Sequence, residues 1–312
     1  MVVAPQIVVG VDGSPSSRAA LEWAARRARR LKLSLQLVHS VPDYLVSPGR
    51  IEYQSVRDVL EGLLHSEASR AREFAPAVDV HTSLHFGEPA QVLAEVSSGS
   101  AMVVVGTDRT ADAHGEGFGA VNLQLAMIGQ CPVAVIPARQ SAVNAGVVVG
   151  IDGSPQSTAA AYFAASEAAS TEQELTVIYV SSAVAGWLGN SALGPTIVMQ
   201  GETAGRMILE STVAALRARH IHLTVCERYE HDDVPARALI NAGQTAVMLV
   251  VGNRGRGAVQ RALMGSTTQD LLLHVPCPIV LTRPDNANNP EVQDSDDGVA
   301  PPAHLPTLPK SF

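Results

Sequence analysis

The sequence of 312 residues is poor in aromatic residues, in cysteine and in long apolar runs. Aromatic side chains make up only 4% of it, so the core must consist mainly of Val, Leu, Ile and Ala. No apolar run approaches the ~20 residues that a transmembrane helix needs. The N-terminus lacks the basic start, the apolar stretch and the cleavage site of a signal peptide. We therefore expect a cytoplasmic protein that does not act at a membrane.

The three cysteines, Cys131, Cys226 and Cys277, have no metal-binding spacing. Two of them stand beside proline and next to apolar runs, which favours buried thiols in a reducing compartment. Two histidine pairs, at 81 and 85 and at 220 and 222, lack a third ligand, so we predict no metal site.

The formal net charge of −8 is unevenly distributed. Residues 284–312 hold five acidic residues and one lysine, and they contribute −4 of the total. A mildly acidic body has no basic surface, so general nucleic-acid binding is not expected. Residues 285–312 are rich in Pro, Asn and Asp without apolar periodicity, which predicts a disordered tail.

Three pairs of short segments show that the chain contains a tandem duplication. The run "GVDGSP" at 10–15 returns as "GIDGSP" at 150–155, and "MVVVGTDR" at 102–109 returns as "MLVVGNRG" at 248–255. The third pair is "CPVAVIP" at 131–137 and "CPIVLTR" at 277–283. We expect domain 1 at residues 1–140 and domain 2 at residues 145–284, packed together because the connection is short.

Short all-apolar runs alternate with helical patterns in both repeats. Such runs are typical of strands buried on both faces of a parallel sheet, joined by right-handed crossovers. The sequence thus predicts an α/β protein with five strands per repeat. The expected strands are residues 7–11, 33–41, 78–87, 102–106 and 133–137, then 147–151, 175–181, 222–229, 248–252 and 279–282.

The first helix is expected to begin after Ser14, a good N-cap, with Pro15 in its first turn. It carries an arginine cluster, which indicates either a patch for an anionic partner or a solvated helix face. We favour the solvated face, because the second repeat has no such cluster. The cluster consists of Arg18, Arg26, Arg27, Arg29 and Arg30.

A glycine-rich stretch after the strand at 248–252 carries the strongest functional signal. Gly252 is followed by Gly255 two residues later, and by Gly265 and Ser266 after nine more, directly before a helix. Glycine tolerates φ > 0 and a close ligand, and a helix start offers free N–H groups to an anion. The spacing predicts a phosphate site. It is neither a Walker A loop, which needs a lysine, nor a dinucleotide fingerprint, which would follow the first strand.

On these residues, and on the Asp-Gly-Ser-Pro starts, the chain resembles tandem universal stress proteins of the bacterial type over about residues 5–284. The family motif is Gly, two residues, Gly, nine residues, then Gly-Ser or Gly-Thr. The resemblance implies Rossmann-like or flavodoxin-like domains with strand order 3-2-1-4-5 and helices on both faces of the sheet. It also implies dimer-like pairing of the last strands, within the chain or in a homodimer.

The resemblance further implies ATP between the first and fourth strands of repeat 2, with Mg²⁺ at the phosphates and no dedicated protein cage. Asp152 and Gly153 would lie at the nucleoside, and the backbone near Val180 at the adenine. The ribose and phosphates would contact Gly252, Asn253, Arg254, Gly255, Arg256, Gly257, Gly265, Ser266 and Thr267.

Repeat 1 departs from the motif, because Arg109 and Ala120 stand where repeat 2 has Gly255 and Ser266. A non-glycine residue at φ > 0 is disfavoured, and Asp108, Asp112 and Glu116 in the same loop oppose a triphosphate. We therefore expect ATP there to bind weakly or not at all. The equivalent positions of repeat 1 are Asp12, Gly13, Val41, Gly106, Gly119 and Ala120.

No evident general base and no adenylate-transfer motif accompanies the glycine stretch, so catalysis is uncertain and we expect no efficient enzyme. The leading hypothesis is an ATP-binding stress-response regulator, in which nucleotide biases repeat packing or an unknown protein partner. The resemblance suggests roles in stress survival, hypoxia or dormancy. The alternatives are a slow ATPase or nucleotide-transfer enzyme, and a nucleotide-free interaction module.

Overall fold

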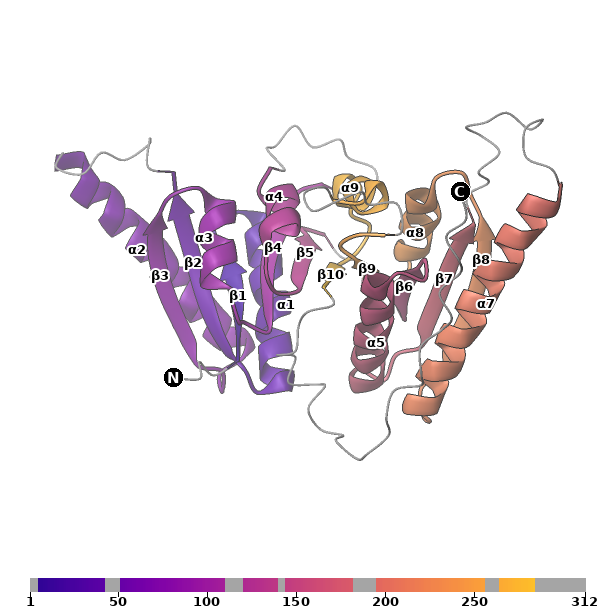
Figure 1. Cartoon of the computed structure of the whole chain (residues 1–312). Coiled ribbons are helices and arrows are strands. Elements are labelled where there is room, and N and C mark those ends of the chain that lie inside the picture. The colour runs from indigo at the N-terminus through magenta and orange to yellow at the C-terminus, as the bar shows by residue number, and fades with distance from the viewer. Residues whose placement is uncertain are drawn as a thin grey trace.

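The computed structural model describes two similar α/β units that share one sheet (Figure 1). The description covers residues 5–42, 51–109, 120–139, 144–181, 195–255 and 264–283.

Repeat 1 contains five strands and four helices within the described residues. In chain order these are β1 (Gln6–Gly10), α1 (Pro15–Leu31), β2 (Ser34–Val41), α2 (Ile51–Phe74), β3 (Val80–Phe86), α3 (Pro89–Val96), β4 (Met102–Thr107), α4 (Ala120–Ile128) and β5 (Val133–Pro137).

Repeat 2 follows the same order in the part that the structure describes. Its elements are β6 (Val147–Ile151), α5 (Pro155–Ser170), β7 (Leu175–Ser181), α7 (Pro195–Arg219), β8 (Val225–His231), α8 (Pro235–Gly243), β9 (Met248–Gly252), α9 (Ser266–Leu273) and β10 (Ile279–Thr282).

The ten strands form one sheet in the order β3-β2-β1-β4-β5-β10-β9-β6-β7-β8. Each half has the expected order 3-2-1-4-5, and its strands are parallel. The last strands pair antiparallel, with Ile279 opposite Val135 and Leu281 opposite Val133. The predicted fold class and the pairing of the last strands are confirmed.

Apolar side chains pack on both faces of the sheet, as the all-apolar strands predict. Successive residues of β1 alternate, with Ile7 and Val9 in one core and Val8 in the other. Helices α1, α2, α5 and α7 cover the first face, whereas α3, α4, α8 and α9 cover the second. No helix in the described ranges is long and apolar enough to cross a bilayer.

Serine caps begin the first helix of each repeat. The Ser14 hydroxyl accepts a hydrogen bond from the Ser17 amide at 3.1 Å, and the Ser154 hydroxyl accepts one from Ser157 at 3.2 Å. Proline follows each cap, where its missing N–H costs nothing. Element boundaries moved by a few residues, the largest shift being β8, which begins at Val225 rather than at 222.

The prediction that the α1 arginines form a solvated face was wrong for Arg27. This side chain is only 5% exposed and pairs with Glu167 on α5 of the other repeat. Arg18 pairs with the buried Glu67 on α2, and Arg26 pairs with Glu22 along its own helix. Single-sequence reasoning missed the Arg27 contact because its partner lies 140 residues away.

The cysteines behave as their surroundings suggested. Cys131 and Cys277 are buried, Cys226 on β8 is exposed, and all three thiols are free. Burial raises the pKa of both buried thiols, that of Cys277 to about 12.

We expect Ellman's reagent to titrate one thiol rapidly in the native protein, because only the thiolate of an accessible cysteine attacks it. That thiol is Cys226, and Cys226→Ser should remove the rapid phase. The other two should react only after denaturation. Rapid labelling of two or more thiols in the folded protein would contradict the buried placement.

Candidate functional site

The candidate site lies at the carboxyl ends of the first and fourth strands of each repeat. In repeat 1, β1 pairs with β4, and in repeat 2, β6 pairs with β9. The strand order reverses between these neighbours, and open α/β sheets bind ligands at this kind of crevice.

The turn after the first strand is held in the same way in both repeats. The Ser14 amide donates to the Asp12 carboxylate at 2.9 Å, and the Ser154 amide donates to Asp152 at the same distance. The Asp12 and Asp152 amides donate to the Ser17 and Ser157 hydroxyls, respectively. The glycine that follows each aspartate has a positive φ, 78° at Gly13 and 79° at Gly153, which glycine adopts without strain. The turn therefore fixes each aspartate at the mouth of the crevice.

The first glycine of the motif is required by a close approach of the helix that follows the first strand of the repeat. A Cβ added at Gly106 would lie 2.3 Å from the carbonyl group of Ser16. One at Gly252 would lie 2.8 Å from the Gln156 side chain. The start of α1 or α5 thus rests directly against the end of the fourth strand.

In repeat 2 the motif glycines gather beside Asp152. A Cβ at Gly255 would lie 2.6 Å from Asp152 Oδ2, whereas one at Gly265 would meet only ordinary contacts, 3.6 Å from the Gly255 amide nitrogen. Gly255 does not have the positive φ that the sequence suggested; proximity to the carboxylate explains the glycine instead. Gly255 therefore lies beside the Asp152 carboxylate, and Gly265 lies beside Gly255.

One further contact ties the start of α9 to the sheet, and a second joins the end of β9 to β10. The Thr268 hydroxyl donates to the Gly252 carbonyl at 3.2 Å, and the Asn253 amide donates to the Thr282 carbonyl. In repeat 1, Asn122 occupies the position of Thr268 and donates to the Gly106 carbonyl at 3.4 Å.

The remaining residues predicted to bind nucleotide lie on several different elements. Ser266 and Thr267 form the first turn of α9, and Ala120 begins α4. Val41 ends β2, and Val180 lies within β7 rather than after it. Arg256, Gly257 and Gly119 lie outside the described residues.

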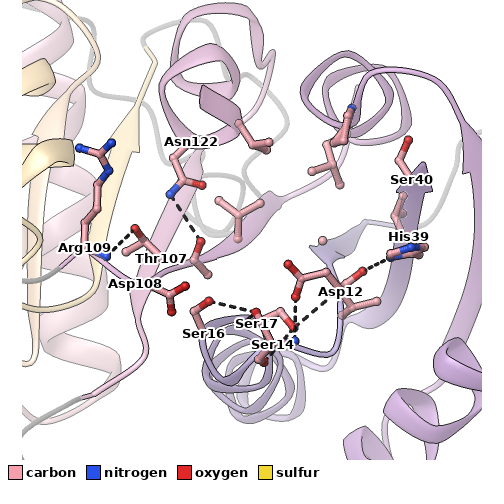
Figure 2. A pocket seen from close by; sticks show the side chains of 18 residues that line it. Asp12, Ser14, Ser16, Ser17, His39, Ser40, Thr107, Asp108, Arg109 and Asn122 are labelled. Carbon is pink, nitrogen blue, oxygen red and sulfur yellow. Dashed lines mark hydrogen bonds between the residues drawn. The ribbon is translucent and has the colours of Figure 1, made fainter. Parts of the chain in front are cut away.

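Repeat 1 contains a cavity of about 380 Å³ at this crevice (Figure 2). Of its predicted site residues, Asp12 and Gly106 line the cavity, whereas Gly13 and Val41 do not. The polar side chains around it come from the α1 start, the β2 end, the β4 end and α4. They are Asp12, Ser14, Ser16, Ser17, His39, Ser40, Thr107, Asp108, Arg109 and Asn122.

Asp12 is held ionised in this crevice. Burial raises its pKa, but hydrogen bonds from Ser14 and Ser17, together with the nearby His39, outweigh burial, so the pKa lies below its ordinary value. His39 Nδ1 lies 2.6 Å from the Val11 carbonyl and therefore donates to it. The carboxylate thus faces the cavity as an acceptor for hydroxyl or amino groups.

Arg109 was expected to be strained by a positive φ, but its backbone does not have one. Within the described residues, positive φ outside glycine occurs at Lys32 and Glu172, not at Arg109. Its amide donates to the Thr107 hydroxyl at 3.2 Å, and its guanidinium points away from Asp12 (Figure 2). The strain argument against ligand binding in repeat 1 is therefore wrong.

Charge distinguishes the two crevices instead. Arg254 of repeat 2 lies near Arg283, whose pKa is lowered by burial and then by the charge of Arg254. At the equivalent positions, repeat 1 has Asp108 and Pro137. Arg254 favours an anionic group in repeat 2, whereas Asp108 at the equivalent position opposes one in repeat 1.

Sequence reasoning missed several polar side chains of the repeat 1 cavity. His39 and Ser40 come from the end of β2, and Ser16 and Asn122 come from helix starts. The only available signal was the placement of polar residues directly after apolar strand runs, as in "LVHS" at 37–40.

Comparison with known proteins gives a consistent result. A model described as the universal stress protein family matches residues 5–137 and again residues 146–283. The universal stress protein Rv1996 of Mycobacterium tuberculosis H37Rv is 30% identical over 306 residues, and MT2052 of strain CDC 1551 is 32% identical over 307; both alignments cover 89% of this chain and 94% of the relative. A universal stress protein from Archaeoglobus fulgidus matches with a TM-score of 0.67 at 17% identity, over 89% of this chain and 98% of its own.

The close approach at Gly106 generates a stability prediction. Gly106→Ala should lower the free energy of unfolding by about 3 kcal/mol, because the new methyl group meets backbone atoms that cannot move aside. Urea denaturation followed by circular dichroism measures this change.

The matched control is Gly62→Ala in the exposed part of α2, where a Cβ meets nothing within 4 Å. That change should stabilise the protein by about 0.7 kcal/mol, since alanine favours a helix interior. Equal effects of the two substitutions would show that α1 does not rest against β4 as described.

Proposed function

This chain belongs to the universal stress protein family, and we propose that it binds ATP in repeat 2 and acts as a stress-response regulator. The observation that carries the proposal is the meeting of Gly255, Gly265 and the α9 start beside Arg254. Free N–H groups at a helix start and a neighbouring arginine form a phosphate site when side chains do not cover the backbone.

Our proposal assigns the nucleoside to the Asp152–Gly153 turn and to the end of β7 near Val180. A carboxylate that accepts hydrogen bonds suits ribose hydroxyls, and Asp152 lies directly beside Gly255. Mg²⁺ would accompany the phosphates with water as its main ligand. The phosphate-contacting set is Gly252, Asn253, Arg254, Gly255, Arg256, Gly257, Gly265, Ser266 and Thr267.

We propose that repeat 1 binds a triphosphate weakly or not at all. Its cavity is large enough for a small organic ligand. Asp108, however, lines this cavity at the position where repeat 2 has Arg254, so a carboxylate replaces a cation there. The reason is therefore charge, and not backbone strain at Arg109.

A physical link supports the idea that nucleotide biases repeat packing. Arg283 donates through Nη2 to the Ala126 carbonyl at 2.8 Å and to the Met127 carbonyl at 3.1 Å, both near the end of α4 in repeat 1. Phosphate at Arg254 would reduce the repulsion that this arginine exerts on Arg283. Ligand binding in one repeat would thereby strengthen a contact to the other.

Two alternatives belong to other functional classes. A slow ATPase or nucleotide-transfer enzyme would produce ADP steadily, in a manner that depends on Gly265 and Ser266. A pure interaction module would carry no nucleotide. The cytoplasmic location, the regulatory partner and a role in hypoxia or dormancy stay predictions.

The nucleotide proposal is tested by purifying the protein without added nucleotide, denaturing it and identifying what is released by chromatography. We expect about one ATP per chain. Gly265→Glu should abolish it, because the carboxylate would occupy the phosphate position while its backbone, with φ of −63°, accepts a side chain.

The matched control is Gly119→Glu, at the same motif position of repeat 1, which should leave the released amount unchanged. Two nucleotides per chain would refute the assignment of weak binding to repeat 1. No nucleotide from the parent, and none bound in a subsequent calorimetric titration with ATP and Mg²⁺, would favour the interaction module.

The packing link has its own test. Hydrogen exchange of the α4 C-terminal amides should slow when ATP is added to the parent, and this effect should be lost in Arg283→Gln. The variant should still bind ATP in a calorimetric titration, because Arg254 and the bare backbone at Gly255 and Gly265 remain. Identical ATP-induced protection of the α4 amides in both proteins would contradict the proposed coupling between ATP binding and the Arg283 contact.

A further inference from the structure

The two repeats meet at a seam formed by β5, β10 and four side chains of α1 and α5. Helix α1 packs on β5 and α5 packs on β10, both on the same face of the sheet (Figure 1). The four side chains are Trp23, Arg27, Phe163 and Glu167.

These four residues are two pairs of equivalent positions. The repeats are offset by 140 residues at the first helix, so Trp23 corresponds to Phe163 and Arg27 corresponds to Glu167. In an arrangement with twofold symmetry, a residue on the axis contacts its own equivalent. Arg27 contacts Glu167 and therefore lies at the pseudo-twofold axis that relates the repeats.

Duplication left the aromatic position similar but reversed the charge at the axis. The Arg27 guanidinium carbon lies 5.6 Å from the Trp23 ring centre and 5.4 Å from that of Phe163, so one aromatic ring from each repeat contacts the cation. Glu167 is fully buried, and its Oε2 also accepts from Arg30 at 2.8 Å. A cation and an anion that are both withdrawn from water are tolerated only as a pair.

We infer that Arg27 and Glu167 determine which partner the seam accepts. The face of repeat 1 accepts a domain of this fold with an acid at the Glu167 position, and it rejects a second copy of itself. Two copies of repeat 1 would bury Arg27 against Arg27, and two copies of repeat 2 would bury Glu167 against Glu167. Either arrangement leaves two like charges without water or counter-ion.

The consequence concerns association between chains and is independent of nucleotide. A homodimer that pairs like repeats through the last strand is excluded by charge. Repeat 1 must pair with repeat 2, in the same chain or head to tail between two chains. The seam therefore favours the intrachain pseudo-dimer over a homodimer that pairs like repeats at this surface.

The test uses the full chain and reads the seam directly by hydrogen exchange with mass spectrometry. Glu167→Arg places Arg27 against a second arginine. The amides of β5 and β10 that bond across the seam should then exchange on the order of 100-fold faster, the usual penalty for an uncompensated buried charge. Amides of the central strands β1 and β6 should keep their protection, which separates seam opening from global unfolding.

The charge-swapped double variant, Arg27→Glu with Glu167→Arg, distinguishes pairing from packing. It restores opposite charges at the axis and should return β5 and β10 exchange to within about tenfold of the parent. Arg30 is a third exposed and can turn toward water. If the double variant exchanges as fast as either single variant, the charges do not determine pairing.

The matched control is Arg57→Glu, which creates a like-charge pair with Glu61 on the exposed side of α2. It should leave seam exchange unchanged, since exposed pairs contribute little. Parent-like exchange of the β5 and β10 amides in Glu167→Arg would overturn the inference. Accelerated exchange in Arg57→Glu equal to that in Glu167→Arg would overturn it as well.

Discussion

The antiparallel hydrogen bonds between β5 and β10 are the interaction on which the rest of the molecule depends. They join two five-stranded sheets into one and so align the helices of both repeats into common layers. One core contains α1 and α5 side chains, and the other contains those of α4 and α9. Because these strands come last in each repeat, the joint does not involve the first strands, β1 and β6, at which the candidate sites lie.

Within each repeat, the crevice depends on how tightly a helix start approaches a strand end. Gly106 and Gly252 permit this approach, and the Asp-Gly-Ser-Pro turn then holds an aspartate beside it. The scaffold is the same in both halves, whereas the charge around it differs. Divergence after duplication thus altered the charged residues around the crevices, while the turn and the close helix approach were retained.

Much of the fold was predictable from local pattern, and the limits of that prediction are physical. All-apolar strand runs, serine caps and the repeat itself identified the elements, since these signals lie within a few residues of each other. The burial of Arg27 was not predictable, because a charge on a helix is solvated unless a distant counter-charge meets it. The polar wall formed by His39, Ser40 and Asn122 was missed for a similar reason: it assembles from separate elements.

For the candidate site, the motif identified glycines that the structure brings together, but it did not give the reason for each glycine. Gly255 was explained by backbone freedom, yet the structure attributes it to the nearby Asp152 carboxylate. The same error led to the expectation of strain at Arg109. The spacing of glycines in the sequence shows where side chains are missing. Only the three-dimensional structure shows which neighbouring group leaves no room for a side chain.

The shared sheet also determines how much of the molecule is open to unwanted strand addition. Two separate five-stranded sheets would expose four edges, whereas the one sheet of the described residues ends at β3 and β8. Unpaired edges are templates for aggregation, and charged side chains weaken them. Strand β8 carries Glu227, Arg228 and Glu230 along its length. Joining the two sheets has therefore halved the number of exposed edge strands. One of the two remaining edge strands, β8, carries charged side chains that disfavour the addition of another strand.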